Sequence, residues 1–156
     1  MQELASGTVV DAVLRSSRAL VAIAARSLAE VTDDVTLPQY RAIVVLCVRG
    51  PIAMRELADE LACSASTATR LCDRLVAKGL VDRAPREGNR REVEVRATAL
   101  GVDLVAAVTA RRRAELEQIV EAMDPQQRPA LVDALSAFAA AAGEAPDQAW
   151  AIGWDL

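Results

Sequence analysis

A change of hydrophobic period between residues 76 and 92 constrains the fold of this chain more than any other sequence feature. From 65 to 78, apolar residues recur at steps of three and four, which predicts a helix with one buried face made by Ala68, Leu71, Cys72, Leu75 and Val76. Beyond Gly79 the period changes from 3.6 to two: residues 80–84 are strand-like, and residues 92–97 alternate polar and apolar as a half-buried strand does. The turn-rich stretch 85–91 joins them. The pattern therefore predicts a helix, a glycine stop and a β-hairpin, in that order.

The segment before this helix predicts a second, shorter helix followed by a tight turn. A short helix is predicted over 54–62, followed by a tight turn at Cys63 and Ser64, where Ser64 is a suitable N-cap for the next helix. Helix, tight turn, helix and hairpin in this order make a winged helix-turn-helix.

Four further helices are predicted outside this unit. Thr36 and Gln39 form a capping box for a helix that ends at Gly50. The other three cover residues 8–30, 99–123 and 125–142. Each has an apolar stripe that we expect to be buried, made in turn by Val10, Val13, Leu14, Ser17, Val21, Ala24 and Leu28; by Leu104, Val105, Val108, Leu116, Ile119 and Met123; and by Leu131, Leu135 and Phe138.

Length and composition disfavour several classes of protein. A chain of 156 residues suits one domain. We find no apolar run long enough to span a membrane and no secretion signal. Three cysteines without metal-ligand spacing predict a reduced, cytoplasmic protein that binds no metal. Histidine is absent and no phosphate loop, dinucleotide fingerprint or nucleophile elbow occurs, so we expect neither an enzyme nor a cofactor.

The charge distribution is less acidic in the middle of the chain than at its end. The formal net charge is −4, yet residues 51–100 carry nine basic and eight acidic side chains. Because DNA binding depends on which face carries the charges, the net charge does not exclude it. It predicts only a weak non-specific affinity.

The polar face of the helix over 65–78 indicates binding to double-stranded DNA. Opposite its apolar face lie Ser66, Thr67, Arg70, Asp73 and Arg74. Short hydroxyls allow a close approach to the major groove, and Arg70 can donate two hydrogen bonds to a guanine. Ser64 and Thr69 can donate to phosphates, as can the helix N-terminus itself. Arg74 lies further along and is expected to meet the DNA backbone, whereas the wing arginines suit a minor groove, namely Arg86, Arg90 and Arg91.

The stretch from Met54 to Arg83, with Lys78-Gly79-Leu80-Val81-Asp82-Arg83 at its end, resembles the helix-turn-helix of the MarR family. Asn89-Arg90-Arg91 stands where that family often has Asp-Arg-Arg, and the likeness spans about residues 8–142. It implies a mainly α fold with a small β-hairpin wing, in one domain: a winged helix-turn-helix over 36–97, dimerisation helices over 1–35 and 98–142, and a C-terminal tail over 143–156. It also implies a transcription regulator, a repressor, that acts as a homodimer on a pseudo-palindromic operator and is released by a small ligand or an oxidant.

Two departures from the family pattern matter. Asn89 replaces the wing aspartate that typically braces an arginine, which leaves the conformation of the wing open. The cysteine of the peroxide-sensing branch is missing from the first helix, so that mechanism does not carry over.

The surplus of apolar surface on the terminal helices predicts a two-fold dimer, the alternative being that these helices only complete a monomeric core. Trp150 and Trp154 either anchor the tail on the partner subunit or are exposed at a frayed end. Tyr40 and Arg41 are candidate effector contacts by resemblance, with Tyr40 also suited to a core position.

Cys63 and Cys72 flank the start of the helix over 65–78, the expected recognition helix, so a thiol-based sensor is one alternative to buried, unreactive cysteines. A winged-helix module that binds protein is the other.

Overall fold

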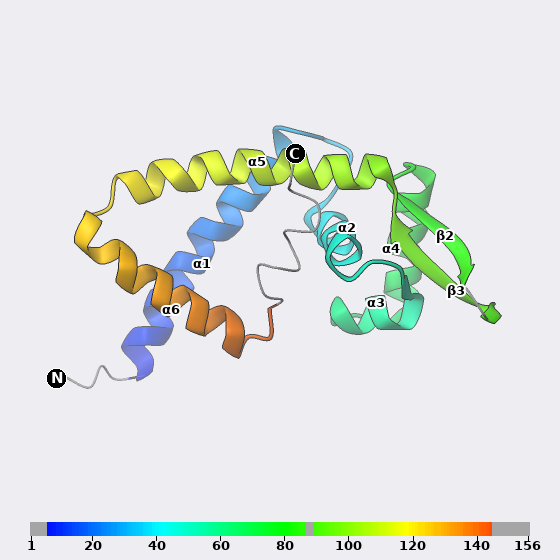
Figure 1. The fold of residues 1–156 in the computed structure, drawn as a ribbon, viewed down its shortest axis with the longest axis horizontal. Coiled ribbons are helices and arrows are strands. Elements are labelled where there is room, and N and C mark those ends of the chain that lie inside the picture. Colours follow the sequence, from blue (N-terminus) through cyan, green and yellow to red (C-terminus); the bar gives the residue numbers. More distant parts are fainter. Residues whose placement is uncertain (1–5, 87–88, 145–156) are drawn as a thin grey trace.

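The computed structural model describes residues 6–86 and 89–144 as a row of helices with one small sheet (Figure 1). This confirms the predicted class, mainly α with a β-hairpin wing. The elements in chain order are α1 (Ser6–Ala29), α2 (Leu37–Arg49), β1 (Ile52–Ala53), α3 (Met54–Glu60), α4 (Ala65–Ala77), β2 (Val81–Arg86), β3 (Asn89–Ala97), α5 (Ala99–Glu121), the 3-10 turn η1 (Pro125–Gln127) and α6 (Arg128–Ala141).

The sheet has three antiparallel strands in the order β1-β3-β2. Sequence analysis missed β1, because two residues are too few to show a period. The predicted wing loop over 85–91 is also corrected: β2 runs on to Arg86, which already pairs with Asn89. A register shift after Pro85 lets the two strands continue past this proline, which has no N–H to donate. The two strands of the wing are therefore longer than the composition of its loop indicates.

One hydrophobic core holds together the winged half of the molecule, which consists of α2, α3, α4 and the sheet. It joins α2, α3, α4 and the sheet to the first half of α5, and its fully buried side chains include Ile43, Leu46, Leu57, Leu75, Val95 and Val108. The capping box predicted for α2 is confirmed, since the backbone N–H of Thr36 donates to Oε1 of Gln39 at 3.0 Å and the N–H of Gln39 donates to Oγ1 of Thr36 at 3.5 Å. These contacts fix where α2 enters the core.

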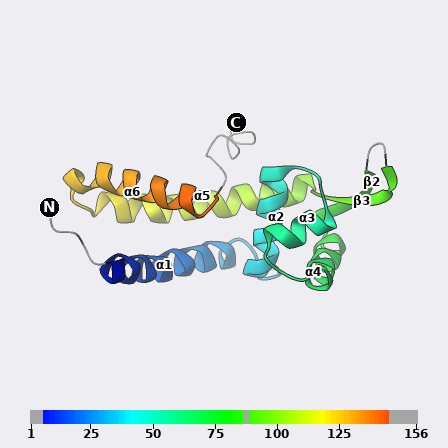
Figure 2. The same cartoon turned by 90° about the horizontal axis from the view of Figure 1, so that it is seen from below.

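The other half of the molecule is an open layer of long helices. α5 runs from the winged half to the far end, where η1 turns the chain into α6, and α1 crosses on the other side of α5 (Figures 1 and 2). The ion pairs Arg26–Glu115 and Arg111–Glu30 tie α1 to α5. Within the described residues, none of these three helices is covered on both sides over its full length.

Several stripes predicted to be buried are exposed instead. Val10, Leu14 and Val21 of α1 are exposed, as are Ile119 of α5 and Leu135 and Phe138 of α6, and α6 buries no residue at all. The physical reason is that nothing within the described chain packs against these faces. The buried residues of α1 and α5 are confined to the parts nearest the core, namely Ile23, Ser27, Leu28, Gly101, Val105 and Val108.

Smaller differences concern helix ends and one side chain of α4. α3 ends at Glu60 and α5 at Glu121, two residues before the predicted ends, as is common at helix termini. Val76, predicted to face inward, is exposed. The core-facing side of α4 is narrower than expected: Ala68, Cys72 and Leu75 are buried, and Leu71 is partly buried against the core.

Candidate nucleic-acid interface

Helix α4 is held with its polar side outward. Ala68, Cys72 and Leu75 are completely buried beneath it. Ser64 is the N-cap, as predicted, and its Oγ accepts a hydrogen bond of 3.2 Å from the N–H of Thr67. At the other end Gly79 has φ +70° and the N–H of Leu80 donates to the carbonyl of Leu75, which closes the helix as the sequence predicts.

The polar side brings the predicted helix residues together on one exposed surface: Ser64, Ser66, Thr67, Thr69, Arg70 and Arg74. The hydroxyls form a local network at the start of the helix, in which Oγ of Ser64 lies 3.0 Å from Oγ of Ser66 and 2.9 Å from Oγ1 of Thr67. The hydroxyl of Thr69 donates to the carbonyl of Ala65 at 2.8 Å. A hydroxyl has one hydrogen to donate, so Thr69 must rotate before it can donate to a phosphate.

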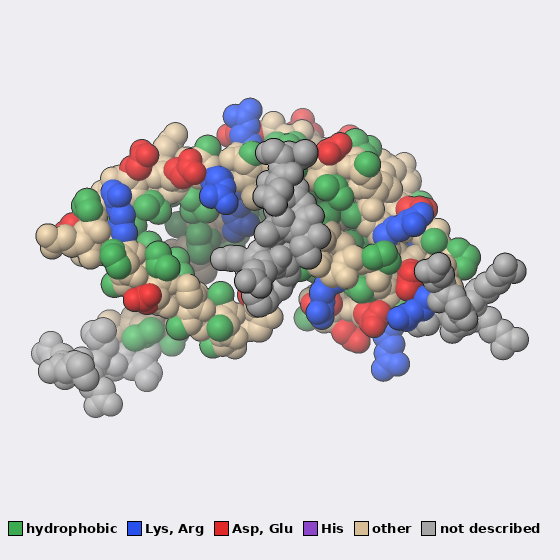
Figure 3. Space-filling model, in the orientation of Figure 1, with side chains coloured by type: hydrophobic (Ala, Val, Ile, Leu, Met, Phe, Trp, Pro, Cys, Tyr) green, Lys and Arg blue, Asp and Glu red, His purple; other side chains and the backbone are tan. Residues whose placement is uncertain are grey.

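Arg70 and Arg74 have no acidic partner among the residues that the structure describes. By contrast, four carboxylates of the winged half are ion-paired: Glu60, Asp73, Asp82 and Glu94. On the face that Figure 3 shows, basic and acidic side chains of this half are interleaved. Pairing of the carboxylates leaves the two helix arginines as available cations.

Of the three wing arginines, only Arg86 has its side chain in the described part of the chain. Nε of Arg86 lies 3.2 Å from Oε1 of Glu94 on the neighbouring strand, so this guanidinium is partly neutralised within the hairpin. The backbones of Arg90 and Arg91 belong to β3, whereas their side chains lie outside the described part of the chain. The same holds for the side chain of Asn89.

Arg83 is a residue of this surface that sequence analysis missed. Its guanidinium lies 2.7 Å from Oδ1 of Asp73 and 3.4 Å from the carbonyl oxygen of Thr69, both on α4. On the other face of the hairpin, Asp82 and Arg96 form a cross-strand ion pair of 2.8 Å. Strand alternation alone places residues 82 and 83 on opposite faces, but it does not show that one of them reaches back to the preceding helix.

The start of α5 is locked to the end of α4. Thr98 caps α5 by accepting from the N–H of Gly101 at 3.2 Å, and its hydroxyl donates to the carbonyl of Gly79 at 2.6 Å. A β-carbon at Gly101 would overlap the carbonyl oxygen of Leu80 and lie 3.3 Å from a methyl group of Ile43. The long helix layer and the recognition helix are therefore in rigid contact at this point.

The candidate effector residues lie where α2 faces α5. Tyr40 is buried, as a core position requires; burial raises the pKa of its hydroxyl, and a hydrogen bond with Thr109 opposes this shift. Arg41 is exposed and pairs with Glu144 at 3.7 Å.

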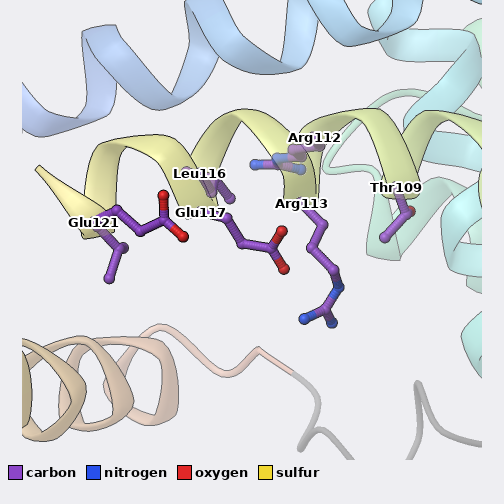
Figure 4. Close-up of a pocket in the computed structure, with 7 residues that line it drawn as sticks. Thr109, Arg112, Arg113, Leu116, Glu117 and Glu121 are labelled. Carbon is purple, nitrogen blue, oxygen red and sulfur yellow. The ribbon is translucent and has the colours of Figure 1, made fainter.

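A cavity of about 410 Å³ opens beside Thr109, lined by Thr109, Arg112, Arg113, Leu116, Glu117, Val120 and Glu121 (Figure 4). Sequence analysis did not identify the two arginines.

Two of the three cysteines, Cys47 and Cys72, occupy environments that lower thiol reactivity. Cys72 is completely buried, and burial raises its pKa although nearby Arg83 acts in the opposite direction. Burial raises the pKa of Cys47 to about 11, whereas Cys63 is partly exposed. Because the thiolate is the reactive form, the thiols of Cys47 and Cys72 are poor sensors. Trp150 and Trp154 lie outside the described residues.

Two features are absent from the described ranges, 6–86 and 89–144. They contain no helix long and apolar enough to cross a membrane, and no cluster of potential metal ligands.

Comparisons with known proteins agree with this geometry. The model of the MarR family matches residues 33–92. The crystal structure of RV1404 from Mycobacterium tuberculosis is 43% identical, with a TM-score of 0.85, and the match covers 93% of this chain and 99% of that one. The uncharacterized HTH-type transcriptional regulator YfiV of Bacillus subtilis is 27% identical over 103 residues, 66% of this chain and 64% of the relative. This chain thus spans just under two thirds of that curated relative.

More distant structures share the fold. A point mutant of S. aureus MepR bound to an oligodeoxyribonucleotide is 18% identical, with a TM-score of 0.63 over 89% of this chain and 99% of that one. NadR in complex with 4-hydroxyphenylacetate is 23% identical, with a TM-score of 0.63 over 89% and 96%.

Proposed function

The chain belongs to the MarR family of transcription regulators, and from this premise we propose that it is a sequence-specific double-stranded DNA-binding repressor that acts as a homodimer on a pseudo-palindromic operator. Residues 36–97 form the DNA-binding part of a single domain, 1–35 and 98–142 form the dimer, and 143–156 form a tail.

One observation carries the DNA-binding function: α4 presents hydroxyls at its N-terminus and, among the described residues, two arginines without acidic partners on the side opposite the core. Arg70 lies one turn into the helix, where it can donate two hydrogen bonds to N7 and O6 of a guanine. Arg74 lies one turn further, where a duplex would present phosphates. We assign phosphate contacts to Ser64 and Thr69, the close approach to the major groove to Ser66 and Thr67, and minor-groove contacts to Arg86, Arg90 and Arg91.

The test is a fluorescence anisotropy titration with the DNA upstream of the gene, repeated at several salt concentrations. Binding that prefers this DNA over a scrambled duplex and weakens steeply with salt supports the proposal. Arg70→Ala should lose the preference, whereas the matched Arg113→Ala on α5 should retain it. If no duplex binds even at low salt, the winged half binds protein instead and the proposal fails.

The dimer is supported by apolar surface that the protomer leaves uncovered. Val9, Val10, Leu14 and Val21 of α1 and Val132, Leu135 and Phe138 of α6 are exposed, all on the helices that lie beyond the winged half. Exposed apolar side chains concentrated on two helices are typical of a subunit interface, because monomeric soluble proteins rarely leave large apolar patches uncovered. A second copy is the proposed occupant, because an interface between identical faces closes with two-fold symmetry.

Two-fold symmetry also specifies the DNA site. It would place two copies of α4 facing the same side of a duplex, with half-sites about 34–36 Å apart, one turn of DNA. The operator should therefore be a pseudo-palindrome with half-site centres about 10 base pairs apart. Footprinting that protects one half-site only would contradict this arrangement.

A small ligand that releases the DNA is proposed to bind in the cavity beside Thr109. Arg112 and Arg113 have no acidic partner in the described part of the chain, and Leu116 and Val120 add apolar surface. Glu117 and Glu121 also line the cavity, so the arginine end suits the carboxylate of a ligand with an apolar body, such as the ligand of NadR. Thr109 of this lining is hydrogen-bonded with Tyr40 of α2, so an occupant could act on α2 through this contact.

The ligand proposal is tested with 4-hydroxyphenylacetate as the probe. A rise in the thermal midpoint and a loss of DNA affinity are expected for the wild type, and both should disappear in Arg113→Gln but persist in Arg18→Gln, a matched exposed arginine on α1. If the probe acts equally on both variants, it does not bind in this cavity.

A further inference from the structure

The side of α4 that is proposed to face DNA carries a carboxylate, Asp73, which the phosphates of a duplex should repel. The side of α4 opposite the core begins at Ser66 and continues at steps of four and three residues through Arg70 to Asp73. These three side chains therefore lie in one row, here called the recognition row. The side chain of Asp73 is 53% exposed. Double-stranded DNA carries one negative charge for about every 1.7 Å of its axis, so a bare carboxylate in this row would oppose binding.

Arg83 covers this carboxylate from the neighbouring strand. It lies on the same face of β2 as the buried Val81, at the point where the strand leaves the core and passes beside α4. Its guanidinium contacts Oδ1 of Asp73 at 2.7 Å, and a second bond of 3.4 Å to the carbonyl of Thr69 holds it across one turn of the helix. Two attachments on α4 fix the guanidinium over Asp73 more firmly than the ion pair alone.

We propose that Arg83 is a positioning residue of the DNA-binding surface: it neutralises Asp73 within the recognition row, so that α4 can approach the duplex with Arg70 directed at the bases. This inference rests on the proposed DNA-binding function. It assigns Arg83 no contact with a base. Its effect is exerted through Asp73.

The pair is poorly suited to a purely structural role. The side chains of Arg83 and Asp73 are 32% and 53% exposed, and exposed ion pairs contribute little to stability because water screens them. Loss of the pair should therefore change the thermal midpoint by only a few degrees. DNA affinity should change much more, because the carboxylate would then face phosphates directly.

The experiment measures DNA affinity and thermal unfolding of three variants. The probe is a fluorescein-labelled duplex that the wild-type protein has selected from a random-sequence library. Arg83→Gln should weaken binding about tenfold or more, since like charges brought together at an interface are strongly unfavourable. Adding Asp73→Asn to this variant should restore affinity to within about threefold of the wild type. Asp73→Asn alone, which does not depend on the stability of Arg83→Gln, should bind at least as well as the wild type.

Arg96→Gln is the matched control, because it removes a cation and an ion pair from the outer face of the same hairpin. It should change affinity about twofold or less. The proposal is overturned if Arg83→Gln binds like the wild type, if Asp73→Asn fails to rescue it, or if Asp73→Asn alone loses affinity. Failure of the wild type to select any duplex would instead refute the proposed DNA-binding function.

Discussion

Replacing Leu135 by alanine should weaken the proposed dimer, and the size of the effect follows from the exposure of this side chain. Leu135 on α6 is 50% exposed in the protomer. Full burial of a leucine contributes about 1.5–3 kcal/mol, so burial of the exposed half contributes about 1 kcal/mol. A two-fold interface contains the residue twice, which gives about 2 kcal/mol for the dimer, or about a 30-fold rise in Kd. A cavity left in the interface would add to this figure.

Leu100 provides a control of the same residue type. It lies in the first turn of α5 beside the winged half and is 57% exposed, so Leu100→Ala removes the same atoms from a similarly exposed position. If α1, α5 and α6 form the interface by their far halves, Leu100→Ala should dimerise like the wild type. Any difference between the two variants then reports position and not hydrophobicity in general.

Sedimentation equilibrium at several concentrations gives the Kd of each variant, and far-ultraviolet circular dichroism checks that the helices are retained. An unchanged Kd for Leu135→Ala would refute the reasoning, because the exposed stripe of α6 would then lie outside the interface. An equal loss in Leu100→Ala would refute it as well.

Three other outcomes are expected. Arg70→Ala should cost about 1–3 kcal/mol of DNA binding and relax the base preference, whereas Arg90→Ala should weaken all duplexes similarly; anisotropy with operator and mutated operator distinguishes them. Gly101→Ala should destabilise the fold by about 1–3 kcal/mol in urea unfolding, because the added methyl group meets a backbone carbonyl that cannot move without shifting the sheet; an unchanged midpoint would contradict this. At pH 8 iodoacetamide should modify Cys63 before Cys47, since burial raises the pKa of the Cys47 thiol to about 11 and leaves little thiolate at that pH. Peptide mass spectrometry gives the order of modification, and the rate at Cys47 should rise until the pH approaches its pKa.

Local features of the fold were predictable because they depend on residues close in sequence. The capping box of Thr36, the N-cap of Ser64 and the glycine stop at Gly79 use contacts within a few residues, and all three occur as predicted. The change of period likewise placed α4 before the hairpin. The row of α4 that contains Arg70 was then predictable as the side of the helix that does not face the core.

Contacts between elements were not predictable in the same way. Arg83 was one of nine basic residues in its third of the chain, and only the packing of β2 beside α4 selects it as the partner of Asp73. Arg112 and Arg113 became candidates only when a cavity was seen beside them.

The winged helix-turn-helix was therefore determined by the sequence itself, through periodicity, caps and turns that act over one or two helical turns. The tertiary structure decided which apolar stripes are buried. Leu28 and Leu135 both belong to regular stripes, yet Leu28 lies in the core and Leu135 is exposed. Periodicity shows that a helix has an apolar side, but burial requires a second surface against that side, and for α6 the described chain does not supply one.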